Sequence, residues 1–193
     1  MKLRNARYLS HDFIDSLLQE GDIAVDATAG NGHDTLYLAQ KVGERGHVYA
    51  FDVQQAALDS TKERLAENGI PDERVTLILS GHERMADYVK EPVRCVLFNL
   101  GWLPSGDHSV TTRVPTTLAA VEAACGLLLP GGMVSVCVYP GHEEGTRELR
   151  ALEEALAGLD IREYNVLHGN FVNQRENAPQ TFLIQREESL RDC

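Results

Sequence analysis

The sequence has 193 residues, of which 43% are hydrophobic and 24% are charged, and its formal net charge at pH 7 is −11. This composition is typical of a soluble globular protein, and no apolar run approaches the roughly 20 residues that a membrane-spanning helix requires. The acidic balance argues against wholesale electrostatic binding of nucleic acid, although Lys2, Arg4 and Arg7 could form a local basic face toward RNA.

The cysteines are scattered along the chain and form no CxxC pair; they are Cys95, Cys125, Cys137 and Cys193. Two of them lie within apolar runs, where buried free thiols are expected. The basic N-terminus is not followed by an apolar stretch, so it is not typical of a secretory signal. We therefore expect a reduced, cytoplasmic protein.

Short apolar runs alternate with helical patterns along the chain. The first helix is expected at 10–19 with Ser10 as its N-cap, and residues 1–20 are expected to form a helical cap. Apolar runs predict strands at 23–27, 47–52, 74–79, 93–100, 133–139, 160–167 and 181–185. Apolar residues at helical spacing predict further helices at 35–42, 54–68, 116–129 and 143–159.

This alternation predicts a single doubly wound α/β domain over residues 1–193. Strand–helix–strand units require right-handed crossovers, which gives a mostly parallel, seven-stranded sheet with helices on both faces. The apolar run at 93–100 predicts a central strand that is covered on both faces. Only the loop 170–180 separates the last two strands, so we expect an antiparallel hairpin at one edge of the sheet.

The first strand ends in a glycine-containing turn with the sequence DATAGNGHD, residues 26–34. Gly30 and Gly32 allow the backbone to turn tightly and to approach a ligand closely. The helix that follows presents unpaired N–H groups to an anionic group such as a carboxylate. Asp26 is placed to pair with an ammonium group, and Asp34 either steadies the turn or faces the same ligand.

Asp52 ends the second strand, where a carboxylate can accept both hydroxyls of a ribose. Sites for NAD use the same device, but here Thr35 replaces the third glycine of GxGxxG. Because an ammonium suits Asp26 and a pyrophosphate does not, the set favours S-adenosylmethionine as the cofactor. A nicotinamide-dependent oxidoreductase and a non-catalytic nucleotide sensor remain alternatives.

The third strand leads into a loop over which an adenine ring is expected to lie, with Gly81 and His82 as neighbours. A solvated loop histidine is the alternative for His82. The predicted contacts of the cofactor are therefore Asp26, Thr28, Gly30, Asn31, Gly32, Asp34, Asp52, Gln54, Gly81 and His82.

The fourth strand delivers Asn99 and then a turn that contains Trp102. Asn99 could orient an amine by accepting its hydrogens, and Trp102 could stack on a base, with a packing role as the alternative for Trp102. Asp107 is a candidate base for the amine, with His108, His142 and His168 as alternatives; for each, a surface or structural role is the competing interpretation. The histidines and cysteines show no metal-ligand spacing, so we expect no metal.

The chain resembles a family of small bacterial proteins described as rRNA methylases, some of which methylate the wobble uridine of tRNA. The resemblance rests on residues 10–14, 26–35 and 51–54 on the donor side and on 99–104, 139–142 and 171–174 on the acceptor side. It departs from the family pattern at residues 168–171, where a more aromatic stretch is expected, and at Pro179, where a proline pair is expected.

The resemblance implies a class I, Rossmann-like methyltransferase that uses S-adenosylmethionine. It further implies that the chain methylates the exocyclic amine of 5-aminomethyl-2-thiouridine at the wobble position, with the anticodon region of tRNA as partner. Ribosomal RNA or a small amine remain alternative acceptors. No membrane association is expected, and a homodimer is compatible with the sequence.

Overall fold

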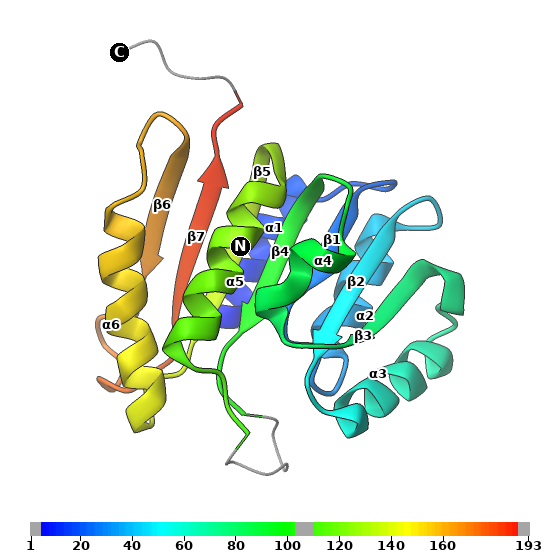
Figure 1. Cartoon of the computed structure of the whole chain (residues 1–193), viewed down its shortest axis with the longest axis horizontal. Helices are drawn as coiled ribbons and strands as arrows, with labels where there is room; N and C mark the ends of the chain where they lie inside the picture. The colour runs from blue at the N-terminus through cyan, green and yellow to red at the C-terminus, as the bar shows by residue number, and fades with distance from the viewer. Residues whose placement is uncertain (1–4, 103–109, 189–193) are drawn as a thin grey trace.

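The computed structural model describes residues 5–102 and 110–188 (Figure 1). Its helices are α1 (Ala6–Leu17), α2 (His33–Val42), α3 (Gln55–Glu67), α4 (Met85–Tyr88), α5 (Val114–Leu127) and α6 (Glu143–Ala157), with 3-10 turns η1 (Asp72–Arg74) and η2 (His82–Arg84). Its strands are β1 (Ile23–Asp26), β2 (His47–Asp52), β3 (Val75–Leu79), β4 (Val93–Asn99), β5 (Leu128–Val138), β6 (Tyr164–Gly169) and β7 (Gln180–Arg186).

These strands form one seven-stranded sheet in the order β3-β2-β1-β4-β5-β7-β6. Strands β1 to β5 pair in parallel, whereas β7 is antiparallel to both β5 and β6. The doubly wound sheet and its antiparallel edge hairpin are therefore confirmed. Because β1 pairs with both β2 and β4, the strand order reverses between β1 and β4, and ligands of open α/β sheets bind at such a point.

Each face of the sheet is covered by its own set of helices. One buried cluster joins the sheet to α4, α5 and α6, for example through Phe98 of β4 and Leu152 of α6. The other joins it to α1, α2 and α3, for example through Leu97 of β4 and Leu38 of α2. Adjacent residues of β4 thus belong to opposite faces, as the pleat of a strand requires. In Figure 1 the layer of α4, α5 and α6 lies in front of the sheet.

The first helix begins earlier than the sequence pattern predicts, and the prediction that Ser10 is its N-cap is wrong. Asn5 caps α1, and its side chain accepts a hydrogen bond from the Tyr8 N–H at 3.0 Å. Ser10 lies within the helix, fully buried, with its hydroxyl 2.9 Å from Thr181 Oγ1 of β7. The serine therefore attaches α1 to the sheet.

Cys95, Cys125 and Cys137 are buried free thiols, one more than the apolar runs predicted, and burial raises the pKa of each. Cys193 lies outside the described residues. Within the described parts of the chain, no helix is both long enough and apolar enough to span a bilayer.

Candidate active site at the carboxyl ends of the parallel strands

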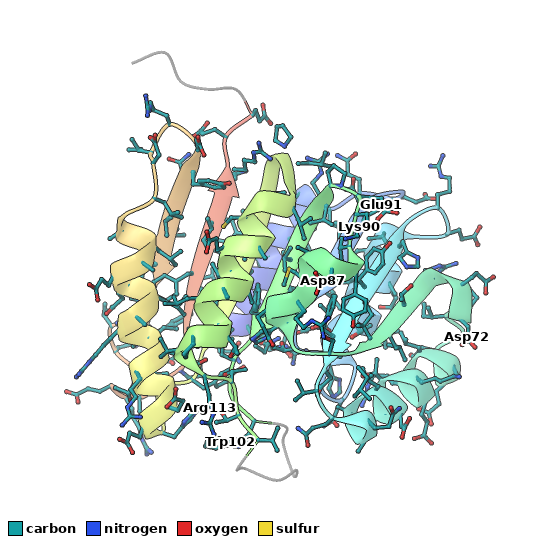
Figure 2. The ribbon with its side chains drawn as sticks, in the orientation of Figure 1. Asp72, Asp87, Lys90, Glu91, Trp102 and Arg113 are labelled. Atoms are coloured by element: carbon teal, nitrogen blue, oxygen red, sulfur yellow. The ribbon has the colours of Figure 1, made fainter. Side chains whose placement is uncertain are left out.

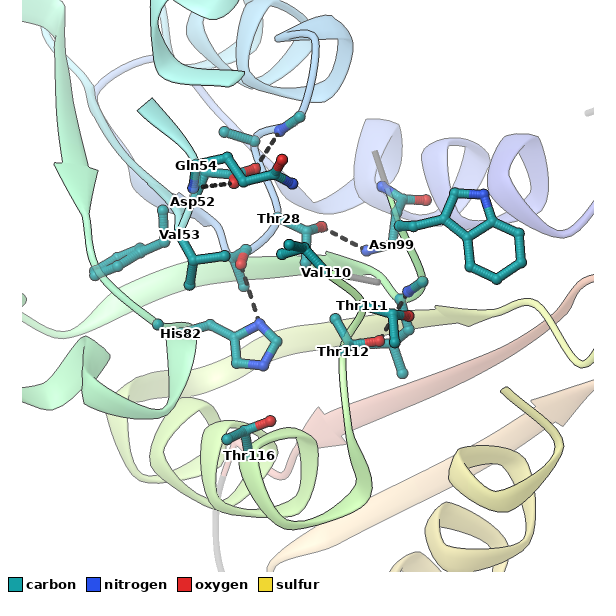
Figure 3. A pocket seen from close by; sticks show the side chains of 18 of the residues that line it. Thr28, Asp52, Val53, Gln54, His82, Asn99, Val110, Thr111, Thr112 and Thr116 are labelled. Carbon is teal, nitrogen blue, oxygen red and sulfur yellow. Dashed lines mark hydrogen bonds between the residues drawn. The ribbon is translucent and has the colours of Figure 1, made fainter. Parts of the chain in front are cut away.

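A cavity of about 600 Å³ lies where the parallel strands end (Figure 3). Its walls come from the turn after β1, the ends of β2, β3 and β4, the segment 110–113 that leads into α5, and the first turn of α5. The volume falls within the range of pockets that hold cofactors and drug-sized ligands. The cavity is therefore large enough for a nucleoside that carries an amino-acid group.

The two glycines of the turn have different tasks. Gly30 lines the cavity with φ of 53°, and its N–H donates to Asp52 Oδ2 at 3.0 Å. Gly32 does not line the cavity; it caps α2 with φ of 75°. A Cβ at Gly32 would lie 2.7 Å from the Thr61 Cα, so the glycine allows the turn to approach α3.

Asp52 faces the cavity at the end of β2 (Figure 3). Its Oδ2 accepts the Gly30 N–H, and its Oδ1 accepts the Gln54 N–H at 2.9 Å. Each carboxylate oxygen can accept a second hydrogen bond. The two bonds to the backbone therefore fix the carboxylate and leave it able to accept a pair of hydroxyls.

Asp26 is fully buried and does not line the cavity, contrary to the expected contact with an ammonium. Its carboxylate accepts the Thr28 N–H at 3.1 Å and the Thr35 hydroxyl at 2.6 Å. Burial, with the nearby carboxylate of Asp34 adding to it, raises the pKa of Asp26 to about 7. Thr35, which replaces the third glycine of the dinucleotide pattern, is thus a support of the turn.

Asp34 is the acidic side chain of this turn that reaches the cavity, although it is only 4% exposed. Its Oδ1 accepts hydrogen bonds from Arg7 Nε at 3.0 Å and Nη2 at 2.5 Å, and it lies 3.0 Å from His11 Nε2. Burial alone would raise the pKa of Asp34, but the hydrogen bonds from His11 and Arg7 lower it to about 2. The N-terminal helix therefore forms part of the site.

Asn99 stands at the end of β4, between the glycine turn of residues 26–34 and the wall that contains Trp102. Its N–H donates to Thr28 Oγ1 at 2.7 Å (Figure 3), and its Nδ2 donates to Asp34 Oδ2 at 2.5 Å. Its Oδ1 is buried and has no hydrogen-bond partner among residues 5–102 and 110–188. A buried acceptor without a partner is costly, so this oxygen is a candidate to bind a ligand N–H.

His82 lies on the wall formed by the end of β3 and is only 8% exposed, so the alternative of a solvated loop residue is wrong. Its Nδ1 lies 3.2 Å from the Ala27 carbonyl oxygen (Figure 3), and burial lowers the pKa of the imidazole. The ring packs edge-on against Phe98, with centroids 5.6 Å apart. This wall thus offers an apolar surface to a flat ring, with Gly81 beside it.

The far wall of the cavity contains Trp102. The centroid of its ring lies 4.2 Å from the centroid of the His142 ring. Figure 2 shows Trp102 and Arg113 at the edge of the molecule below α5, and both line the cavity. His142 caps α6, where its Nδ1 accepts the Gly145 N–H at 3.1 Å. Asp107 and His108 lie outside the described residues.

A buried carboxylate that the sequence analysis missed supports this wall. Glu148 of α6 is 1% exposed and accepts hydrogen bonds from the hydroxyls of Thr112 at 3.0 Å and Thr117 at 2.6 Å. The Thr112 hydroxyl in turn accepts the Gly101 N–H at 2.8 Å. Through the Thr112 hydroxyl, Glu148 therefore holds in place the segment between Asn99 and Trp102.

The structure brings most of the predicted cofactor contacts to the cavity, namely Thr28, Gly30, Asn31, Asp34, Asp52, Gln54, Gly81 and His82. His168 is not among the lining residues; it lies 2.7 Å from Gln180 Oε1 instead. Among the residues that the structure describes, no group of three histidine, cysteine, aspartate or glutamate side chains could hold a metal ion.

The chain is similar to known proteins in sequence and in fold. A family model described as "Putative rRNA methylase" matches residues 48–185. The chain is 37% identical to the "tRNA (mnm(5)s(2)U34)-methyltransferase, chloroplastic" of Arabidopsis thaliana, in an alignment that covers 95% of this chain and 70% of that protein.

Two solved structures resemble the whole fold. A "putative rRNA-methylase" from Clostridium thermocellum is 42% identical with a TM-score of 0.93, over 96% of this chain and 100% of that one. A "putative methyltransferase" from Streptococcus mutans, solved in complex with SAH, is 38% identical with a TM-score of 0.87, over 96% and 99% of the two chains.

Proposed function

The chain belongs to the rRNA methylase family, and from this premise we propose that it methylates an amine of transfer RNA. It has the class I methyltransferase fold, and its methyl donor is S-adenosylmethionine. The acceptor in our proposal is the exocyclic amine of 5-aminomethyl-2-thiouridine at the wobble position. The name of the relative from A. thaliana supports this choice of substrate.

The donor half of the proposal rests on the walls described above. Asp52 would accept the ribose hydroxyls, because its carboxylate is fixed toward the cavity by two backbone N–H groups. His82 and Gly81 would face the adenine ring. Gly30, Asn31 and Gln54 would line the path between them. Asp26 is assigned to the support of the turn, because it is buried behind the cavity.

The observation that carries the acceptor half is the unpartnered Oδ1 of Asn99. An amine attacks through its lone pair, so its N–H groups must be held by acceptors while the lone pair faces the methyl group. Asn99 Oδ1 is such an acceptor, and it lies between the donor turn and the wall of Trp102. Because methyl transfer is a direct displacement, positioning of this kind can supply much of the rate.

Two further residues belong to the proposed acceptor side. Trp102 would stack on the uracil ring or on a neighbouring base, since aromatic stacking is a common way to hold an unpaired nucleotide. Asp107, which lies outside the described residues, remains a candidate base for the proton that the amine must lose.

The test is transfer of a labelled methyl group from S-adenosylmethionine to three purified substrates, followed by nucleoside mass spectrometry. The substrates are tRNA that carries 5-aminomethyl-2-thiouridine, the same tRNA as an unmodified transcript, and ribosomal RNA. We expect only the first to gain one methyl group, on the wobble nucleoside. Methylation of ribosomal RNA alone would move the acceptor to that substrate.

A further inference from the structure

Arg7 is a cation at the donor cavity that the proposed function does not yet use. It lies on α1, far in sequence from the glycine turn, and its side chain is 34% exposed where it lines the cavity. Lys2 and Arg4, with which it was expected to form a basic face, lie outside the described residues. The guanidinium is held against Asp34 instead of pointing away from the protein.

The hydrogen bonds of this pair leave the arginine, and not the aspartate, able to take a ligand. The Asp34 carboxylate already accepts from Arg7 and Asn99 and lies 3.0 Å from His11 Nε2. A guanidinium has five N–H donors, and the bonds to Asp34 use only Nε and Nη2. Within the described part of the chain, Arg7 Nη1 donates no hydrogen bond. The guanidinium therefore has unused N–H donors for an anion.

The amino-acid end of the donor carries such an anion. If the ribose lies at Asp52 and the adenine at His82, the lining that remains for the methionyl group includes Arg7 and Asn99, which both donate hydrogen bonds to Asp34. The first turn of α2, which begins at His33, presents its N–H groups and its positive dipole end to the same region. The Arg7 guanidinium is hydrogen-bonded to Asp34 of that same first turn, so the free donors of Arg7 and the N–H groups of the turn lie close together.

We propose that Arg7 binds the carboxylate of the donor's methionyl group together with the first turn of α2, while Asp34 holds the guanidinium in position. This inference rests on the donor half of the proposed function and is independent of the acceptor. Arginine suits the task because its planar fork can bond Asp34 with one edge and a second carboxylate with another. A lysine, with a single ammonium, cannot keep both contacts in the same geometry.

Isothermal titration calorimetry with two ligands separates recognition of the carboxylate from support of the fold. S-adenosylhomocysteine has the amino-acid end, whereas 5′-methylthioadenosine has the same nucleoside and sulfur without it. For Arg7→Ala we expect the affinity for S-adenosylhomocysteine to fall about ten- to hundred-fold, as for the loss of a hydrogen bond to a charged group. The affinity for 5′-methylthioadenosine, measured by competition if it is weak, should change less than two-fold.

Three further variants distinguish recognition of the carboxylate from a purely structural effect. Arg7→Ala with Asp34→Asn removes both charges, so no buried carboxylate loses its counter-ion, and it should show the same selective loss. Arg45→Ala removes an exposed arginine that pairs with Glu20, and it should leave both affinities unchanged. Arg7→Lys should recover only part of the affinity for S-adenosylhomocysteine.

An unchanged affinity of Arg7→Ala for S-adenosylhomocysteine would overturn the proposal, and so would an equal loss for both ligands. Failure of the wild-type chain to bind either ligand would instead remove the donor half of the proposed function. If the wild-type chain did not methylate tRNA but Arg7→Ala still lost affinity for S-adenosylhomocysteine alone, the assignment of Arg7 would stand. Only the proposed methyl acceptor would then be wrong.

Discussion

Asp34 determines which way the side-chain amide of Asn99 points. Its ionised carboxylate can only accept hydrogen bonds, and the 2.5 Å contact to its Oδ2 must therefore come from the Asn99 Nδ2. The carbonyl oxygen of the same amide is then directed to the other side, where it is buried without a partner in the described residues. Asp34 thus leaves the Asn99 Oδ1 available to accept a hydrogen bond from the substrate.

Replacement of Asn99 with alanine should strongly slow methyl transfer while donor binding is kept. We expect kcat to fall by about 10²–10³-fold, the usual cost of removing one positioned polar group from a reacting centre. The affinity for S-adenosylhomocysteine should stay within a few-fold, because Asp34 keeps its bonds to Arg7 and its contact with His11. Asn68→Ala, an exposed asparagine at the end of α3, is the matched control. Full activity of Asn99→Ala would contradict the proposed role of Asn99 in positioning the amine.

Asp52→Ala should abolish measurable donor binding without unfolding the protein. The carboxylate is proposed to accept two ribose hydroxyls, and each hydrogen bond to a charged group contributes about 1.5–3 kcal/mol. Calorimetry with S-adenosylhomocysteine measures the loss, and circular dichroism checks that the fold is kept. Asp72→Ala, an exposed residue of η1 (Figure 2), should bind normally. An unchanged affinity of the Asp52 variant would contradict the ribose assignment.

The donor turn could be predicted from the sequence because its parts are local or lie at the ends of adjacent parallel strands. Gly30 and Asp52 meet for that reason, and the bounds of β2 agree with the apolar pattern. The direction of Asp26 could not be predicted, because a residue at a strand end can face either the cavity or the core. Its hydrogen-bond partner Thr35 gives the signal in retrospect, since it has a hydroxyl where the dinucleotide pattern has its third glycine.

The contacts of Arg7 with Asp34 and of Thr112 with Glu148 could not be predicted, because each joins elements far apart in sequence. Such pairs depend on which helix packs over which strand and at what angle. The pattern of apolar residues indicates that α1 and α6 cover the sheet, but it does not give their rotation. A polar residue within an otherwise buried helical face, as at Glu148, is the only available signal.

Removal of the Glu148 carboxylate should weaken binding of tRNA at the wall that contains Trp102, without affecting binding of the methyl donor. In Glu148→Ala the hydroxyls of Thr112 and Thr117 lose their shared acceptor, so the segment from Gly101 to Trp102 loses its support. We expect KM for tRNA to rise about ten-fold or more, consistent with about 1–3 kcal/mol for buried groups left unsatisfied. Calorimetry with S-adenosylhomocysteine should give the wild-type affinity.

Two variants test whether this effect is specific to the buried carboxylate. Glu148→Gln keeps one carbonyl oxygen as an acceptor and should recover part of the affinity for tRNA. Glu154→Ala removes an exposed glutamate of the same helix and should change neither the KM for tRNA nor the affinity for S-adenosylhomocysteine. If Glu148→Ala weakened both ligands equally, a general loss of structure would explain the result better than a role at the acceptor wall.

Asp26 should make the stability of the protein depend on pH near neutrality. Its pKa of about 7 in the folded state lies above the value of ~3.9 for an unfolded chain, so the folded state binds the proton more tightly. Its favourable contribution is therefore fully present below about pH 4 and is lost as the pH rises through 7. Asp34 behaves oppositely: its pKa of about 2 keeps its contribution constant at every pH above about 5.

Asp26→Asn removes this titration, since the amide stays neutral while its oxygen can still accept the Thr28 N–H. Relative to wild type, the variant should gain about 2–3 kcal/mol of unfolding free energy between pH 5 and pH 8, because each unit of pKa shift corresponds to about 1.4 kcal/mol. Urea unfolding at a series of pH values measures the difference. A difference that stays constant with pH would show that Asp26 is ionised throughout. Because Asp26 does not line the cavity, the variant should bind S-adenosylhomocysteine normally at pH 7.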